Sequence, residues 1–241
     1  MIGCRCQVCR SDDARDKRLR TAALVSIGNT NIAIDCGPDF RQQMLHAGIE
    51  HLDAIIITHE HNDHVIGLDD VRPFNFLQRR DMPVYATTSV GKELETRFAY
   101  VFNENPYPGA PRITLIPINK DQVFEIKGIP IRPIEVMHGS LPILGFRISD
   151  FAYLTDVLTI SEEERSKLDG VDTLVLNALH HEPHATHLNL EQALAMISRL
   201  NPRRTFLTHM SHRIGLHAEV NRILPSGVAL AHDDMHFYCN L

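Results

Sequence analysis

Short apolar runs that end in a histidine or an aspartate recur along this chain. The first run, at 54–57, is followed by Thr58 and His59. The same order returns at 129–136 before His138, at 151–154 before Asp156, at 173–176 before His180 and at 205–207 before His209. Brief apolar runs with polar boundaries are typical of buried β-strands, although two prolines in 129–136 favour a sheet edge for that strand.

Helical patterns and turn signals lie between these runs. Predicted helices occupy 39–48, a segment after the capping pair Ser161 and Glu164, a segment after the cap Asn189, and 216–224. Strands at 22–27 and 31–34 are joined by a two-residue turn at 28–29, which predicts a hairpin. The proline-rich stretch 72–112 is the least regular, and we expect loops there. Helices that follow short strands indicate an α/β fold in which the polar strand ends gather along one rim.

The composition describes an ordinary globular chain of 241 residues with 44% apolar and 22% charged residues. No stretch resembles a linker, so we expect a single domain over 1–241. A formal net charge of -6 disfavours nucleic acid as a partner. An apolar leader and a run of about 20 apolar residues are both missing, which predicts a cytoplasmic protein without a membrane partner.

The clearest chemical signal is a cluster of metal-binding side chains. Four donors, His59, His61, Asp63 and His64, fall within six positions. A lone histidine is more often a surface or core residue, but four donors so close together exceed what one ion can bind comfortably. We therefore predict two divalent ions, completed by the later donors His138, Asp156 and His209, with Asp156 able to bridge. Nitrogen and oxygen donors of this kind suit zinc, manganese or iron, of which we expect zinc or manganese.

The pattern His-x-His-x-Asp-His after an apolar strand, with a later His, Asp and His, resembles the metallo-β-lactamase superfamily. The resemblance covers nearly the whole chain and implies a four-layer αββα sandwich. It also implies that His59, His61 and His138 hold one ion, that Asp63, His64 and His209 hold the other, and that Asp156 bridges. Asp35, in an Asp-x-Gly sequence, matches a position that orients the ligands, or simply forms a turn after its strand.

Within that superfamily the chain is similar to the phosphodiesterase family that opens phosphoribosyl cyclic phosphate in the carbon–phosphorus lyase pathway. The Cys-x-Cys-x-x-Cys knuckle at 4–9 resembles a structural zinc site of that family. The resemblance implies the zinc ligands Cys4, Cys6, Cys9 and His212. The family has a strand and a turn before this knuckle, whereas here Met1 almost adjoins it, so either the start is truncated or an edge strand is absent.

The segment 183–187 resembles the stretch that supplies a catalytic histidine in those enzymes and in transfer-RNA 3′-processing nucleases. His187 is therefore the candidate proton donor to the leaving group, and His184 is the alternative donor. A structural alternative for His187 is that it only flanks the start of the next helix. Asp63 is predicted to be both a metal ligand and a catalytic residue. Arg72 and His184 are candidate substrate contacts, and Arg72 would pair with a phosphate or form an exposed ion pair.

These observations predict a metal-dependent hydrolase that acts on a small, cyclic phosphodiester. Two alternatives are a hydrolase of carbon esters, such as a thioesterase or lactonase, and a transfer-RNA 3′-processing nuclease. A metal-binding scaffold without turnover is a third, but every ligand of the active set and a proton donor are present. By resemblance alone, we also expect a homodimer.

Overall fold

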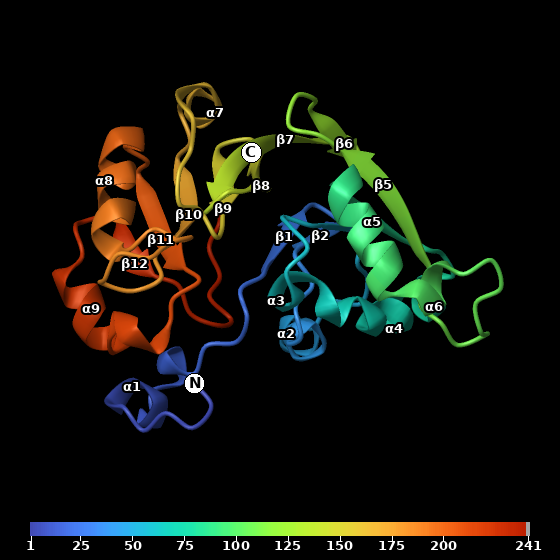
Figure 1. The fold of residues 1–241 in the computed structure, drawn as a ribbon, viewed down its shortest axis with the longest axis horizontal. Helices are drawn as coiled ribbons and strands as arrows, with labels where there is room; N and C mark the ends of the chain where they lie inside the picture. Colours follow the sequence, from blue (N-terminus) through green and yellow to red (C-terminus); the bar gives the residue numbers. More distant parts are fainter. Residues whose placement is uncertain (240–241) are drawn as a thin grey trace. The chain divides into compact units, whose positions relative to one another are not determined.

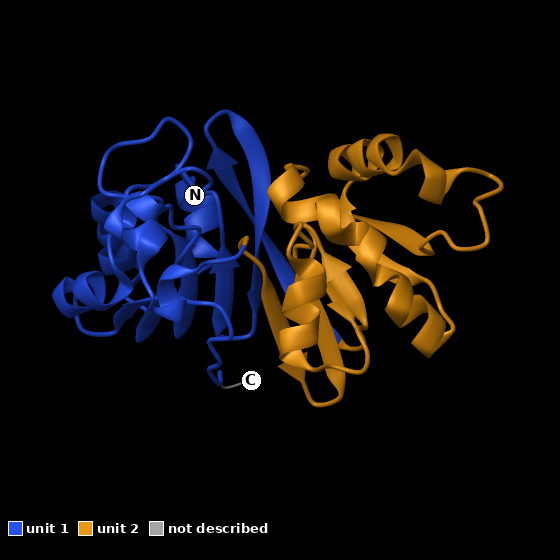
Figure 2. Cartoon of the chain, turned by 90° about the horizontal axis from the view of Figure 1, so that it is seen from below, with its two compact units in different colours: residues 1–19, 129–241 blue, residues 20–128 orange. Residues whose placement is uncertain are grey.

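A computed structural model describes residues 1–239, and its contacts divide the chain into two compact units. One unit comprises residues 1–19 and 129–241, and the other comprises residues 20–128 (Figure 2). None of the helices within residues 1–239 combines the length and the apolar character that crossing a membrane requires.

The unit formed by residues 20–128 contains a five-stranded sheet whose strands lie in sequence order (Figure 1). The strands are β1 (Ala23–Ile27), β2 (Thr30–Ile34), β3 (Ala54–Ile56), β4 (Met82–Thr87) and β5 (Ile113–Ile118). The first two pair antiparallel across the predicted 28–29 turn, with Ile27 opposite Thr30, which confirms the hairpin. The remaining pairs are parallel, so the carboxyl ends of β2 to β5 share one edge.

Helices connect these strands and cover a core of buried apolar side chains. They are α2 (Phe40–Ala47), α3 (Asn62–Val65), η2 (Ile66–Val71), α4 (Arg72–Gln78), α5 (Thr88–Arg97) and α6 (Ala99–Phe102). The expectation of loops over 72–112 was wrong, because α4, β4, α5 and α6 occupy most of that stretch. Pro73 lies where it does little harm, in the first turn of α4, which needs no amide hydrogen from it.

The other sheet has seven strands in the order β12-β11-β10-β9-β8-β7-β6. They are β6 (Phe124–Ile126), β7 (Ile129–His138), β8 (Leu141–Ile148), β9 (Phe151–Leu154), β10 (Thr173–Asn177), β11 (Arg204–Thr208) and β12 (Val228–Leu230). The expectation that β7 lies at the edge was wrong, since it is second in this order. The edge strand β6 has three residues against ten in β7 and can pair with only part of it, which leaves room for prolines.

The helices of this unit are short, apart from α8. They are α1 (Gln7–Arg10), η1 (Ala14–Asp16), α7 (Glu162–Ser166), α8 (Leu190–Leu200), η3 (His212–Ile214) and α9 (His217–Ile223). Asn189 and Gln192 form a complete capping box at the start of α8, which confirms the predicted cap. At α7 Ser161 caps as predicted, but the Glu164 carboxylate accepts from the backbone N–H of Glu135 and thereby ties α7 to β7.

Candidate metal centre

Four potential ligands of the unit 20–128 lie in the loop after β3 and in the single turn of α3. His59 is fully buried, and its Nε2 lies 3.0 Å from Nδ1 of His61. The ring centroids of His59 and His64 are 4.3 Å apart. Asp63 Oδ2 lies 3.8 Å from Nε2 of His64. The structure therefore brings the four donors of the predicted cluster close together within this unit.

Asp35, directly after β2, is the centre of a hydrogen-bond network behind these donors. Its buried carboxylate accepts from the backbone N–H of Thr58 at 2.8 Å and from the Thr58 hydroxyl at 2.9 and 3.0 Å. It also lies 2.7 Å from Nδ1 of His64. A carboxylate can only accept, so the His64 proton sits on Nδ1 and the Nε2 lone pair remains for a metal.

The same network fixes the ring of His59. Because the Thr58 hydroxyl donates to Asp35, it must accept from His59, whose Nδ1 lies 2.9 Å away. His59 consequently presents an unprotonated Nε2. Sequence reasoning found Asp35 but missed Thr58, because a threonine between a strand and a histidine gives no signal of its own.

Two glycines let the loops of this unit approach one another closely. A Cβ at Gly37 would lie 2.2 Å from the carbonyl oxygen of Asp63, and a Cβ at Gly67 would lie 2.1 Å from the carbonyl oxygen of Gly37. Cys36 reinforces the contact, since its N–H donates to His64 O and its carbonyl accepts from the Gly67 N–H. The backbone of Asp63 and His64 is thus held against the loop that carries Asp35.

The donors of the other unit stand at strand ends, as predicted. Strands β7 and β9 are both antiparallel to β8, and β9, β10 and β11 are parallel, so β7, β9 and β11 end at the same edge. His138 is the last residue of β7, Asp156 follows β9 by two residues, and His209 directly follows β11. Asp156 and His209 have φ of 57° and 53°, a strained backbone that often marks functional sites.

The buried carboxylate of Asp156 gathers the imidazoles of this edge. Its Oδ1 lies 3.2 Å from Nε2 of His209 and 2.8 Å from Nε2 of His187. Nδ1 of His138 lies 3.0 Å from the backbone oxygen of Asp156 and 2.9 Å from that of Thr186. Carbonyl oxygens only accept, so His138 is protonated on Nδ1 and its Nε2 lone pair remains for a metal.

His187, the predicted proton donor, lies beside the metal donors of its own unit. His138, Asp156 and His187 offer ligand atoms within 4.8 Å of one another, so His187 could itself bind an ion. Its Nδ1 lies 2.8 Å from the Thr186 hydroxyl and 3.0 Å from Nδ1 of His184. Desolvation and, after it, the charge of His187 lower the pKa of His184.

The N-terminal knuckle forms a second group of donors within its own unit. Cys4, Cys6, Cys9 and His212 offer ligand atoms that all lie within 4.8 Å of one another. Nδ1 of His212 lies 3.5 Å from Cys4 Sγ and 3.4 Å from Cys6 Sγ. The hydrogen bond with His212 lowers the pKa of Cys6 to about 6, which favours the thiolate. Three thiols and one imidazole are the donor set of a closed structural zinc site.

Arg72, the candidate phosphate contact, begins α4 and is already partly engaged. Its guanidinium lies 3.3 Å from the Asp69 carboxylate and donates to the carbonyl of Gly109 at 3.3 Å. Asp69 also accepts a hydrogen bond from the hydroxyl of Tyr100. The side chain of Arg72 remains 38% exposed, so it can still bind an anion.

Residues 30–210 match the family model described as a beta-lactamase superfamily domain. The chain belongs to the metallo-β-lactamase superfamily. Its fold is the mixed α/β, two-sheet fold of that superfamily, which confirms the predicted fold class. The match includes residues of both units. The expectation of a single domain over 1–241 stays a prediction. In this superfamily the fold implies divalent metals, and the histidine and aspartate donors described above have the chemistry to bind them.

Among solved structures, the chain is similar to a diphosphatase from the PhnP family, with 37% identity and a TM-score of 0.92. That match covers 100% of this chain and 92% of the other. An octanoyltransferase of Porphyromonas gingivalis is 42% identical over 97% of this chain but over 48% of its own length. A ribonuclease Z of Macrococcus caseolyticus is 29% identical over 56% of this chain and 44% of its own length. The chain thus spans about half the length of these two curated relatives or less.

Proposed function

We propose that this metal-dependent hydrolase is a dinuclear phosphodiesterase that acts on a small, cyclic phosphodiester. The observation that carries the proposal is the similarity to the PhnP-family diphosphatase, which extends over both chains almost completely. Phosphate-ester chemistry suits a pair of ions, which together neutralise an in-line displacement at phosphorus.

The ligand pattern of the superfamily gives three donors to each ion and one bridging carboxylate. We therefore assign His59, His61 and His138 to one ion, Asp63, His64 and His209 to the other, and Asp156 to a bridging position. The assignment rests on the ligand pattern of the superfamily and on the ring orientations described above, which leave Nε2 of His59, His64 and His138 unprotonated. We propose zinc or manganese as the native ion, since both accept such donors.

The bound ions would lower the pKa of water, which supplies the nucleophile, and would stabilise negative charge on the phosphoryl oxygens. The chain itself must deliver a proton to the departing alkoxide. We assign this step to His187, whose ring is held between Asp156 and the Thr186 hydroxyl. His184, at 3.0 Å from His187, is the alternative donor.

The roles of His187 as a proton donor and as a ligand predict different outcomes. If His187 is the donor, His187→Ala should lower kcat about 10²- to 10⁴-fold on cyclic diesters of alkyl alcohols and leave the metal content unchanged. The loss should shrink with p-nitrophenol as the leaving group, which departs without a proton. Loss of an ion would instead make His187 a ligand. The same loss of kcat in His184→Ala, with His187→Ala unaffected, would make His184 the donor.

One relative favours a second candidate, a hydrolase of carbon esters. The octanoyltransferase is 42% identical to this chain, and its name describes chemistry on an acyl group. That protein is about twice as long as the matched region, so the acyl activity could belong to its other half. The ribonuclease Z match covers about half of this chain, and the net charge of -6 weakens the case for an RNA substrate.

A substrate panel separates these candidates. Purified protein with measured metal content should be tested on bis-p-nitrophenyl phosphate, a ribose 1,2-cyclic phosphate, p-nitrophenyl octanoate, an octanoyl thioester and a lactone. We expect kcat/KM for the diesters to exceed that for every carbon ester by at least about 100-fold, which is a difference of about 2.7 kcal/mol. Faster turnover of the octanoyl esters would refute the proposal. Protection of RNA by a metal-free ligand variant would support the nuclease alternative.

We also propose a cytoplasmic location and a homodimeric state for this protein. The three knuckle cysteines need reduced thiols to bind zinc, which suits the cytoplasm. A homodimer is proposed by resemblance to the family, and sedimentation analysis would test it.

A further inference from the structure

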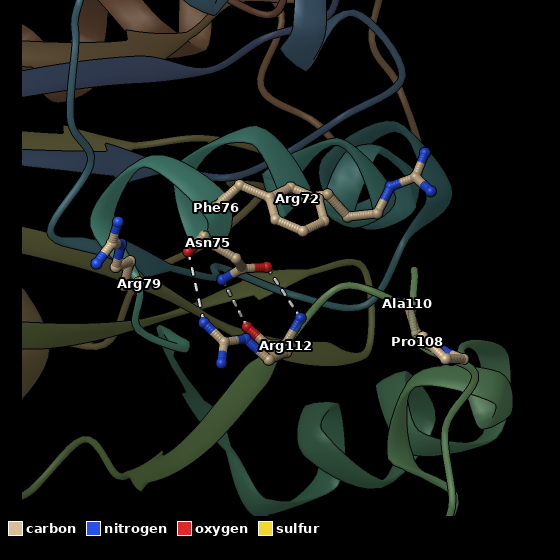
Figure 3. Close-up of a pocket in the computed structure, with 7 residues that line it drawn as sticks. All are labelled: Arg72, Asn75, Phe76, Arg79, Pro108, Ala110 and Arg112. Carbon is tan, nitrogen blue, oxygen red and sulfur yellow. Dashed lines mark hydrogen bonds between the residues drawn. The ribbon is translucent and has the colours of Figure 1, made fainter.

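A basic pocket that none of the proposed metal ligands enters lies within the unit 20–128. It has a volume of about 290 Å³ and is lined by Arg72, Asn75, Phe76, Arg79, Pro108, Ala110 and Arg112 (Figure 3). This volume is close to the lower limit for small-molecule sites. Three of the seven lining residues are arginines, and none of these seven described residues is acidic.

The pocket walls are fixed by hydrogen bonds. The buried amide of Asn75 donates to the carbonyls of Arg80 and Arg112 and accepts from the Arg112 N–H at 2.9 Å. This clamp ties the segment before β5 to α4. At the other end of α4, Arg72 donates to the carbonyl of Gly109. A site whose walls are already held in place loses little entropy when a ligand binds.

The arginine charges are only partly neutralised. Arg112 Nε lies 3.4 Å from the Asp81 carboxylate, and both side chains are about half exposed, so that pair is weak. The 3.3 Å pair between Arg72 and Asp69 is also partly exposed. Arg79 directly follows α4 and has no carboxylate within ion-pair distance among residues 1–239. The pocket therefore keeps a net positive charge that suits an anion.

Phe76 gives the pocket an aromatic surface between its charges. In Figure 3 the Phe76 ring lies between the guanidinium groups of Arg72 and Arg79, which stand at opposite ends of α4. Phe76 is 70% exposed. An exposed ring beside guanidinium groups whose charge is only partly neutralised is the combination with which proteins bind nucleotides, since the ring stacks on a base and the arginines bind phosphate.

We infer that this pocket binds a nucleotide, with its phosphate at Arg79 and Arg112 and its base on Phe76. The inference uses the lining of the pocket alone and does not rest on the phosphodiesterase proposal. It would give the hydrolase a ligand site separate from the proposed metal ligands, and it accounts for the exposure of an aromatic ring at this place.

The chain contains no tryptophan, so Phe76→Trp creates a fluorescent reporter at this pocket alone. Titration of the metal-loaded protein with AMP should quench this fluorescence to saturation. Ribose 5-phosphate should bind without quenching and should compete more weakly than AMP. Leu45→Trp, on the exposed surface of α2, is the reporter control and should show no saturable quenching.

The charge contribution is tested in the Phe76→Trp background. Arg79→Gln and, separately, Arg112→Gln should each weaken AMP binding about tenfold or more. Arg41→Gln, an exposed arginine on α2, should change it less than twofold. Quenching that does not saturate, equal binding of AMP and ribose 5-phosphate, or equal effects of the Arg79 and Arg41 substitutions would overturn the inference. The melting temperature of Arg79→Gln should equal that of the parent, which would show that the protein is intact.

Discussion

Replacing Asp35 by asparagine should weaken metal binding without touching a ligand. The Asp35 carboxylate accepts hydrogen bonds from Thr58 at 2.8 to 3.0 Å and from His64 at 2.7 Å. An asparagine has the same shape, but its amide nitrogen is a donor and its single oxygen cannot serve all these partners. When the amide faces His64, the ring proton must move to Nε2, and the lone pair that would bind the ion is lost.

The size of the effect follows from the position of Asp35 behind the ligands. Substitutions of residues that orient ligands typically cost 10- to 100-fold in metal affinity, or about 1.4 to 2.7 kcal/mol. Because Asp35 also orients His59 through Thr58, we expect the upper part of this range. Competition with a chromogenic chelator measures the affinity of parent and variant directly.

Asp53 provides the matched control for this experiment. It too is a buried carboxylate of the same unit, and it accepts from the Asn31 N–H at 2.9 Å, from Arg80 at 2.7 Å and from Lys127 at 2.6 Å. Asp53→Asn should lower the free energy of unfolding by roughly 1 to 3 kcal/mol and keep the metal affinity of the parent. If Asp35→Asn binds metal as tightly as Asp53→Asn, the orienting network described here is irrelevant to the ions.

Three smaller perturbations test other parts of the structure. Asn189→Ala should lower the free energy of unfolding by about 1 kcal/mol in urea titrations, because it removes the cap of α8. An unchanged urea midpoint of unfolding would show that the cap does not contribute to stability. Gly145→Ala would place a Cβ 2.2 Å from Leu154 Cδ2 and should cost about 1 to 3 kcal/mol, so a fully stable variant would contradict the packing of β8 on β9. Cys6→Ser should remove one zinc ion per chain, as measured by elemental analysis, and lower the melting temperature; a full zinc complement in the variant would show that the knuckle is not a metal site.

Much of the fold could be predicted because its signals are local. The 28–29 turn marks the β1–β2 hairpin, and Asn189 marks the start of α8. The stretch 72–112 was misjudged because prolines count as helix breakers in a pattern, whereas Pro73 occupies a first turn that tolerates it. The place of β7 in its sheet was misjudged because strand order depends on contacts between distant segments, which periodicity does not report.

In the candidate site, too, local signals could be predicted from the sequence and contacts between distant segments could not. The ligands could be found because histidines and aspartates after strands are conspicuous in a sequence. The network behind them could not, since the link from Asp35 through Thr58 to His59 depends on distances of about 3 Å between three separate side chains. The sequence predicted His187 as a proton donor outside the ligand set, and this stays a prediction; the 2.8 Å distance from its Nε2 to Asp156 could not be read from the sequence.

We propose that the histidine and aspartate donors described above bind one pair of catalytic ions. Metal content by mass spectrometry, paired with turnover of a cyclic phosphodiester, should be measured for the parent, His64→Ala and His138→Ala. We predict three ions in the parent, two catalytic and one at the knuckle, and the loss of at least one catalytic ion and of at least about 100-fold in kcat/KM in each variant, with the knuckle ion retained. A parent that hydrolyses the diester with the knuckle ion alone, or variants that keep all three ions and full activity, would contradict the account.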